Sequence, residues 1–351
     1  MTPFHEPFKP STFVCQPAAA LIITKGGEVE VFSPQCSMPV TTFPTFGGVG
    51  RTSSLLDEEL ILLGNDYNRT REGRYVSIQK PRDGLLAMQY SIQNIPLKGS
   101  PHQHTSLVSK NTLAVVGGKF KSKGKLSKFT WTGLSLHWQS GAKYNPDVAA
   151  SCAVKLGVDV HIIFGGERKI NDQRISESQV VKINTTEEIA YEMKGMQHKR
   201  AFHGCALLNS SVVLLSGGLN QSKIQPDELY NIISQKTVKV LDWEHSLRRY
   251  NHALTRMGDR IFGVGGIDSN NSAPSKIAEF DAATNTWADL SQELHSRDTS
   301  EIVVSPFPAA SLDCVPQCQC GVGNREGRIF GGTETKVRST YCKIMFVYTF
   351  L

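Results

Sequence analysis

Apolar segments that end in a pair of glycines recur along this chain at nearly constant spacing. The four complete pairs are Gly117-Gly118, Gly165-Gly166, Gly217-Gly218 and Gly265-Gly266. Successive pairs lie 48, 52 and 48 residues apart. A run of four or five apolar residues that ends in turn-forming residues is typical of a buried β-strand. Isolated glycine pairs are common in turns, but four at this spacing indicate a structural repeat.

Weaker copies of the pattern extend it toward the N-terminus. Residues 60–63 lead into Gly64, which lies 53 residues before Gly117, and residues 20–25 lead into Gly26-Gly27. Each full repeat has four apolar pieces, as expected for a four-stranded sheet. The first copy has no strand before it, and residues 301–304, which follow the last repeat, are predicted to supply that strand.

This pattern resembles the kelch family over about residues 19–305. The resemblance implies an all-β fold, a six-bladed kelch-type β-propeller in which radial closure hides the strand edges. The glycines that count the blades are Gly26, Gly64, Gly117, Gly165, Gly217 and Gly265. We therefore predict a leader over residues 1–18, a propeller over 19–305 and a cysteine-containing, largely irregular tail over 306–351.

Large aromatic residues follow most of the glycine pairs at about twenty residues. Trp138, Trp243 and Trp287 occupy this position, with Tyr191 and Tyr90 as weaker substitutes. Such residues are expected to fill the gap between neighbouring sheets.

Three histidines share one position in the first strand of their repeats, namely His104, His203 and His252. Equivalent positions on different blades are spread around a ring, so we interpret them as one repeated structural role. The chain also lacks a set of Tyr, Cys and His residues that could correspond to the copper site of galactose oxidase-type kelch enzymes. We predict no metal site and no cofactor.

The eight cysteines include two groups that allow different interpretations. Cys152 and Cys205 occupy equivalent positions in first strands and are interpreted as small buried residues. Four others gather in the last forty residues, where a second pair of metal ligands is missing, and we favour disulfide bonds for them. These four are Cys314, Cys318, Cys320 and Cys342.

The segment 314–335 resembles the activation junction of trypsin-like serine proteases. Cysteine precedes a basic residue there, and the sequence continues Arg328-Ile329-Phe-Gly-Gly. The resemblance implies cleavage after Arg328, a new N-terminus at Ile329, and Cys320 as the tether to a protease body. Phe330 replaces the usual valine, and only 19 residues follow Gly332, without the motifs of a catalytic triad. We interpret the chain as a shortened or alternatively ended form of a propeller–protease precursor.

Charge and targeting signals narrow the partners only slightly. The net charge of +6 permits an anionic partner without requiring one, and no segment is long and apolar enough for a membrane helix. We expect no nucleic-acid binding and no membrane insertion, and residues 1–6 do not resemble a signal peptide. The densest basic run is interpreted as a solvated loop after a strand; it contains Lys119, Lys121, Lys123, Lys125 and Lys128. Five Asn-x-Ser/Thr glycosylation motifs, or sequons, start at Asn68, Asn184, Asn209, Asn220 and Asn270.

Three functions are compatible with these patterns. We favour a non-catalytic, extracellular propeller that binds a protein or a glycan, since the protease-like junction and the sequons indicate secretion. The alternatives are an intracellular kelch adaptor that presents a protein partner, and the pro-region of an active trypsin-like protease whose catalytic domain is absent from this chain. An enzyme active as written is disfavoured, because no triad is present.

Overall fold

The computed structural model describes separate ranges of the chain. These are residues 20–24, 28–33, 36–42, 52–56, 59–65, 73–79, 89–95, 104–110, 112–117, 125–131, 136–143, 148–171, 173–295, 299–300, 302–306, 317–321 and 341–345. They consist of β-strands and connections, with a short 3-10 helix η1 (Trp243–His245).

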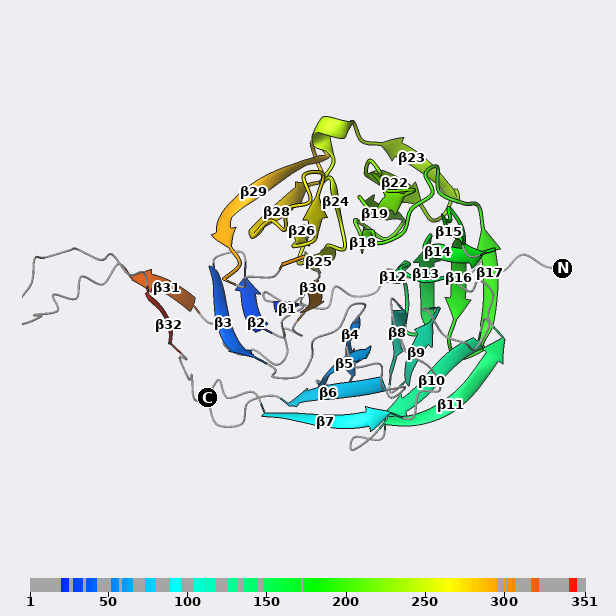
Figure 1. Ribbon diagram of the computed structural model, residues 1–351, viewed down its shortest axis with the longest axis horizontal. Coiled ribbons are helices and arrows are strands. Elements are labelled where there is room, and N and C mark those ends of the chain that lie inside the picture. The colour runs from blue at the N-terminus through cyan, green and yellow to red at the C-terminus, as the bar shows by residue number, and fades with distance from the viewer. Residues whose placement is uncertain are drawn as a thin grey trace, which may run out of the picture.

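The described strands form six four-stranded antiparallel sheets arranged around a ring (Figure 1). Sheet 1 contains β30 (Ile302–Pro306), β1 (Ala20–Thr24), β2 (Glu28–Ser33) and β3 (Cys36–Thr42). Sheet 2 contains β4 (Thr52–Leu56), β5 (Glu59–Asn65), β6 (Gly73–Gln79) and β7 (Gln89–Ile95). Sheet 3 contains β8 (Thr105–Ser109), β9 (Thr112–Val116), β10 (Lys125–Trp131) and β11 (Leu136–Lys143).

The other three sheets follow in chain order. Sheet 4 contains β12 (Cys152–Lys155), β13 (Val160–Phe164), β16 (Val180–Asn184) and β17 (Ile189–Met193). Sheet 5 contains β18 (Gly204–Leu207), β19 (Val212–Ser216), β22 (Glu228–Asn231) and β23 (Lys236–Val240). Sheet 6 contains β25 (Ala253–Met257), β26 (Arg260–Val264), β28 (Lys276–Asp281) and β29 (Thr286–Glu293). An all-β ring of this kind fits a β-propeller.

Four smaller two-stranded sheets lie outside the six. Three belong to the loops of sheets 4 to 6: β14 (Glu167–Ile170) with β15 (Gln173–Ser176), β20 (Leu219–Asn220) with β21 (Lys223–Ile224), and β24 (Arg249–Tyr250) with β27 (Ile267–Asp268). The fourth pairs β31 (Gln317–Gly321) with β32 (Tyr341–Met345), with Cys320 opposite Cys342. The expected irregular tail therefore contains at least this strand pair; the described backbone places two of its cysteines in register.

The second strand of a sheet is covered on both faces. In β9, β13, β19 and β26 the last four residues of each strand are buried. The outer strand β17 is mostly exposed. Because both faces of a second strand contact protein, its sequence is a continuous apolar run rather than an alternation.

The last strand in the ring joins the two ends of the repeat array. β30 pairs antiparallel with β1, from Ala20 opposite Pro306 to Thr24 opposite Ile302. Side chains of sheet 1 also pack on sheet 6, where Phe32 and Phe262 make an edge-on contact at 5.2 Å between ring centroids. The strand predicted from residues 301–304 is thus supplied from the far end of the chain.

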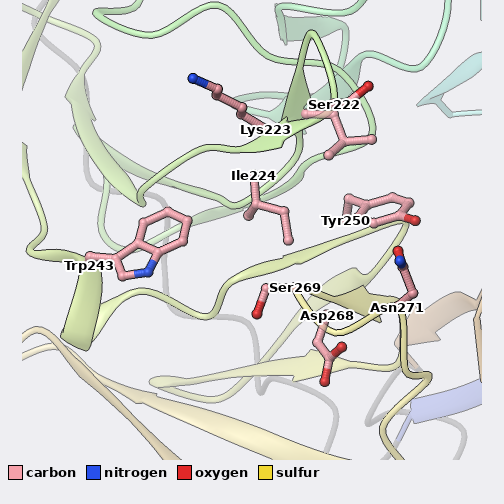
Figure 2. Close-up of a pocket in the computed structure, with 9 residues that line it drawn as sticks. Ser222, Lys223, Ile224, Trp243, Tyr250, Asp268, Ser269 and Asn271 are labelled. Atoms are coloured by element: carbon pink, nitrogen blue, oxygen red, sulfur yellow. The ribbon is translucent and has the colours of Figure 1, made fainter.

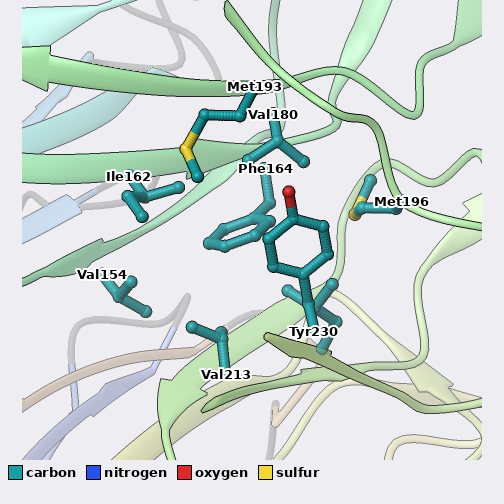
Figure 3. Close-up of a cluster of buried hydrophobic side chains, with 9 residues drawn as sticks. Val154, Ile162, Phe164, Val180, Met193, Met196, Val213 and Tyr230 are labelled. Atoms are coloured by element: carbon teal, nitrogen blue, oxygen red, sulfur yellow. The ribbon is translucent and has the colours of Figure 1, made fainter. Parts of the chain in front are cut away.

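Adjacent sheets are joined by apolar clusters, as Figure 3 shows between sheets 4 and 5. Phe164 and Tyr230 meet edge-on at 5.4 Å within this cluster. The Tyr230 hydroxyl, at the cluster edge, donates to the carbonyl of Lys194 at 2.6 Å. Burial raises the pKa of this phenol to about 12, so it remains a donor at neutral pH.

A disulfide bond crosses from sheet 4 to sheet 5. It joins Cys152 on β12 to Cys205 on β18, whose Cα atoms lie 6.0 Å apart. The sequence predicts separate buried residues at these positions, and that prediction is wrong. Equivalent positions on neighbouring first strands lie side by side in the ring, which brings the two sulfurs together.

The glycine pairs are required by close backbone contacts. A Cβ at Gly217 would lie 2.0 Å from the carbonyl oxygen of Arg249, on β24 just before sheet 6. A Cβ at Gly218 would lie 2.7 Å from the carbonyl oxygen of Ala201 in its own repeat. The Gly218 N–H donates to that same Arg249 carbonyl at 2.9 Å. The first glycine therefore allows the backbone before the next sheet to pack closely, and the second allows the same for the backbone before its own sheet.

We expect Gly217→Ala to cost about 3 kcal/mol or more of unfolding free energy, because strain and a backbone clash combine. Gly258→Ala is the matched control: φ is +63° against +55° at Gly217, but nothing lies within 4 Å of an added Cβ. That variant should lose only about 1 kcal/mol. Urea unfolding of both variants measures the difference, and equal losses would contradict the packing role of Gly217.

Candidate functional site

A pocket of about 580 Å³ lies where the loops of sheets 5 and 6 meet (Figure 2). We call it the sheet 5–6 pocket. It is lined by Leu219, Ser222, Lys223, Ile224, Trp243, Tyr250, Asp268, Ser269 and Asn271. Its volume is within the usual range for ligand pockets, about 300–1,000 Å³.

Two tight turns shape the opposite sides of this pocket. On sheet 5, Gln221 and Ser222 have positive φ, as in the two-residue turns that connect hairpins such as β20–β21. On sheet 6, Asp268 Oδ1 accepts from the backbone N–H groups of Asn270 at 2.8 Å and Ser272 at 2.9 Å. Both turns follow directly from a glycine pair, so they emerge at the same end of their sheets.

Trp243 forms an apolar wall of the pocket with one face partly covered. Its indole is 43% exposed, and the Arg248 guanidinium lies 5.1 Å from the ring centroid. Arg248 Nε also donates to the Trp243 carbonyl at 2.7 Å, which fixes the cation over the ring. Lys223 and Asp268 add opposite charges to the lining. The pocket thus offers apolar area together with charged and hydroxyl groups.

A buried ion pair holds the sheet 5 side of this region. Arg200 and Glu228 are fully buried and form a salt bridge, and Arg200 also donates to the carbonyls of Gly217 at 2.8 Å and Pro226 at 2.9 Å. Glu228 further accepts from the Thr237 hydroxyl at 2.8 Å and from backbone N–H groups. Burial raises the pKa of Glu228, but Arg200 and Thr237 outweigh it, so this pKa is lowered and the pair stays ionised. Both terminal nitrogens of the Arg200 guanidinium have partners, while its Nε has none. The bonds from these two nitrogens hold the Gly217 carbonyl, just before β20, against the buried pair.

Asp227 connects sheet 5 to sheet 6 through hydrogen bonds. Its Oδ1 accepts from the Gly217 N–H at 2.9 Å, and its Oδ2 accepts from Trp287 Nε1 at 2.7 Å and the Leu247 N–H at 3.3 Å. Burial raises the pKa of this carboxyl despite these hydrogen bonds. One side chain therefore sets the positions of the diglycine, the loop behind Trp243, and the last strand of sheet 6.

The tryptophans predicted from the repeat alignment have different environments. Trp287 packs against Phe280 at 5.2 Å and joins the cluster between sheets 5 and 6. Trp243 occupies the equivalent sequence position but lies on η1 at the surface, because the chain leaves sheet 5 before reaching it. Tyr191 is 55% exposed on β17 and also fills no gap. Trp138 and Tyr90 lie on β11 and β7, with side chains outside the described part of the structure.

Three buried histidines directly precede the first strands β8, β18 and β25, rather than lying on them as predicted. His104, His203 and His252 are all less than 7% exposed. The His252 ring lies against two glycines of sheet 5, since a Cβ at Gly204 would be 2.9 Å from its Nε2 and one at Gly217 would be 3.1 Å from its Cε1. Among the described residues, no group of three or more His, Cys, Asp or Glu side chains is arranged to hold a metal ion.

Several predicted residues fall outside the described ranges. These are the predicted leader over residues 1–18, Gly26, Gly118, Asn68, Cys314, Arg328, Ile329 and the lysines from Lys119 to Lys123. Lys125 and Lys128 lie on strand β10 rather than in the predicted solvated loop. The structure does place Asn220 and Asn270 in loops of the sheet 5–6 pocket, and Asn184 and Asn209 elsewhere.

The sequence patterns did not predict a role for Arg200 and Arg249, which precede the first strands of sheets 5 and 6. Arg249 repeats the role of Arg200, since it donates to the carbonyl of Gly265 at 3.4 Å as Arg200 does to that of Gly217. Both belong to an Arg-x-x-His pattern, Arg200 to His203 and Arg249 to His252. This repeated pattern was the signal that could have identified them.

One of the two sheets that form the pocket, sheet 6, matches a known sequence family. Residues 248–292 match the Kelch motif. This span covers sheet 6 except for the last residue of β29, and it supports kelch repeats in a β-propeller. A kelch domain is typically a non-catalytic module that binds protein partners. No curated protein is significantly similar to the chain. In the described residues, no helix has the length and apolar character needed to cross a membrane.

Proposed function

We propose that this chain is a six-bladed kelch propeller that binds a segment of an extracellular protein in the sheet 5–6 pocket. The observation that carries the proposal is the pocket itself, which combines Trp243 and Tyr250 with Lys223 and Asp268 on loops of two packed sheets. Binding sites often lie on loops that a rigid scaffold positions. Aromatic anchors supply most of the affinity of such sites, and flanking charges fix orientation.

A peptide-like segment fits this lining better than a glycan. Arg248 covers one face of the Trp243 indole, so the ring offers limited area for stacking on a sugar. The pocket instead accommodates an apolar side chain beside Trp243 and a charged group near Lys223 or Asp268. A glycan ligand is the second candidate, favoured by the hydroxyl and amide groups of Ser222, Ser269 and Asn271.

The test is a selection of peptides from a random displayed library on the purified secreted chain, with a glycan array in parallel. For selected peptides, Trp243→Ala should raise Kd about 30-fold, since loss of a central aromatic anchor costs about 2 kcal/mol. Tyr191→Ala is the matched control because Tyr191 is equally an exposed aromatic residue, on the outer strand of sheet 4. Peptides that bind the Trp243→Ala variant unchanged would place the binding site elsewhere; glycan binding without peptide binding would favour the second candidate.

The extracellular setting is supported by the cysteine and sequon positions. A disulfide between first strands, Cys152 to Cys205, is typical of proteins that fold in oxidising compartments. This argues against the intracellular adaptor, in which the two thiols would be reduced. Non-reducing peptide mapping of the protein from its native tissue tests the point, and free thiols at both positions would favour the adaptor.

We further propose that the chain derives from a propeller–protease precursor. The support is the sequence of residues 314–335, with Arg328-Ile329 as the expected cleavage position. Mass spectrometry of native secretions should find a peptide that begins at Ile329 and continues into a protease body. A search that recovers only the 351-residue product would contradict the precursor.

A further inference from the structure

Two of the five sequons flank the sheet 5–6 pocket. Asn220 is the last residue of β20, between the pocket residues Leu219 and Ser222. Asn270 lies between Ser269 and Asn271, which both line the pocket. Figure 2 shows Ser222 and Lys223 on one side of the cavity and Asp268, Ser269 and Asn271 on the other. The two sequons therefore belong to loops that face each other across the opening.

The geometry points to a shielding function: we propose that Asn220 and Asn270 carry N-linked glycans that restrict access to the sheet 5–6 pocket. This inference rests on the proposed extracellular module, because N-glycosylation takes place in the secretory pathway. These two sequons differ from the others because the residues beside them line the same pocket.

The asparagine side chains at these two positions are available for modification. Asn270 is exposed and Asn220 is half-buried, and the hydroxyl residues Ser222 and Ser272 that complete the two sequons are exposed. Within the described residues, neither carboxamide takes part in a hydrogen bond. By contrast, Asn209 Oδ1 accepts from the N–H groups of Ser211 and Val212, both at 2.9 Å, and holds its turn.

The modification follows ordinary glycosyl transfer. The asparagine Nδ2 attacks the anomeric carbon of an oligosaccharide carried on a polyprenyl diphosphate. A new Nδ2–C1 bond forms as the C1–O bond breaks, and the polyprenyl diphosphate is the leaving group. A base of the catalysing transferase accepts the proton that Nδ2 loses. No redox change occurs, and the folded loops need only leave the glycan in solvent, which their exposure allows.

Two bulky glycans on facing loops would act differently on large and small ligands. A folded protein surface would be excluded from Trp243 and Lys223, whereas a narrow extended segment could still enter between the glycans. Trimming or loss of the glycans would open the pocket to larger partners. Sequons on other loops, such as Asn209 in the turn between β18 and β19, would have no such effect.

The experiment uses the full chain secreted from a glycosylating eukaryotic host behind an added signal peptide. Glycopeptide mapping establishes occupancy at Asn220 and Asn270. A bulky polyethylene-glycol succinimidyl ester then labels lysines, and the labelling rate of Lys223 in the pocket lining is compared with that of Lys236, where β22 turns into β23. Both lysines are exposed.

Both sites should be occupied, and Lys223 should be labelled at least about threefold more slowly than in Asn220→Gln/Asn270→Gln. Lys236 should be unchanged, and Asn209→Gln, a matched loss of an exposed sequon, should leave Lys223 unchanged. Absence of glycan from either asparagine, or equal Lys223 labelling with and without the glycans, overturns the inference. No peptide is used, so failure of the pocket to bind peptides would leave this result standing and would count against the proposed function alone.

Discussion

Deleting residues 298–310 should lower the melting temperature far more than deleting residues 321–351. The first deletion removes β30, which makes five residue pairs with β1 and closes the ring. At roughly 1 kcal/mol for each net hydrogen-bonded pair, and about 1.4 °C for each kcal/mol in a chain of 351 residues, the loss is about 7 °C. The second deletion removes β32 and leaves the six sheets intact.

Differential scanning fluorimetry compares the two deletions with the full chain. Ring closure also hides the inner edge of β1, so the first deletion should increase aggregation on heating. If that variant does not accumulate, Ile22→Ala supplies a graded test, since Ile22 is fully buried in the cluster shared by sheets 1 and 6. Its expected cost is about 2–5 kcal/mol. Equal effects of the two deletions, or a neutral Ile22→Ala, would contradict closure through sheet 1.

Lowering the pH from 7.5 to 5.0 should destabilise the protein through buried neutral histidines. Burial lowers the pKa of His252 to about 3 and of His161 to about 4, and it lowers that of His203 well below 6.5. Neighbouring Arg249, Lys155 and Arg200 respectively reinforce these shifts. The unfolded chain binds protons near pH 6.5 and the folded chain does not, so stability falls as pH drops below 6.5 until the folded pKa is reached.

The expected loss at pH 5 is about 2 kcal/mol for each of the three imidazoles. Asp227 acts in the opposite sense, because its pKa is raised by burial and its protonation favours the folded state as pH falls through that value. Urea unfolding at several pH values measures the net slope between pH 6.5 and 5. His252→Leu should reduce this slope by about one proton, whatever its effect on stability at pH 7.5. An unfolding free energy that does not change between pH 6.5 and 5 would show that the folded and unfolded chains bind protons equally, which would contradict the lowered pKa values of these histidines.

The sequence by itself determined the repeat and the strands that compose it. The second strands appear as continuous apolar runs because both faces of each are covered, and the glycine pairs mark backbone contacts that exclude any Cβ. Both signals are local and recur along the chain, so a periodic pattern is enough to find them. The closing strand was predicted for the same reason: the first repeat lacked a strand and the end of the array had one spare.

Only the tertiary structure decided which residues of different repeats meet. Cys152 and Cys205 are 53 positions apart and form a disulfide because equivalent positions on neighbouring sheets adjoin. Trp243 and Trp287 share a repeat position, yet Trp243 lines a pocket from η1, while Trp287 donates a hydrogen bond to Asp227 between sheets 5 and 6. The pocket itself combines two loops of irregular length with the connection between sheets. Loop conformation and contacts between sheets depend on non-local packing, which leaves no periodic trace in the amino-acid sequence.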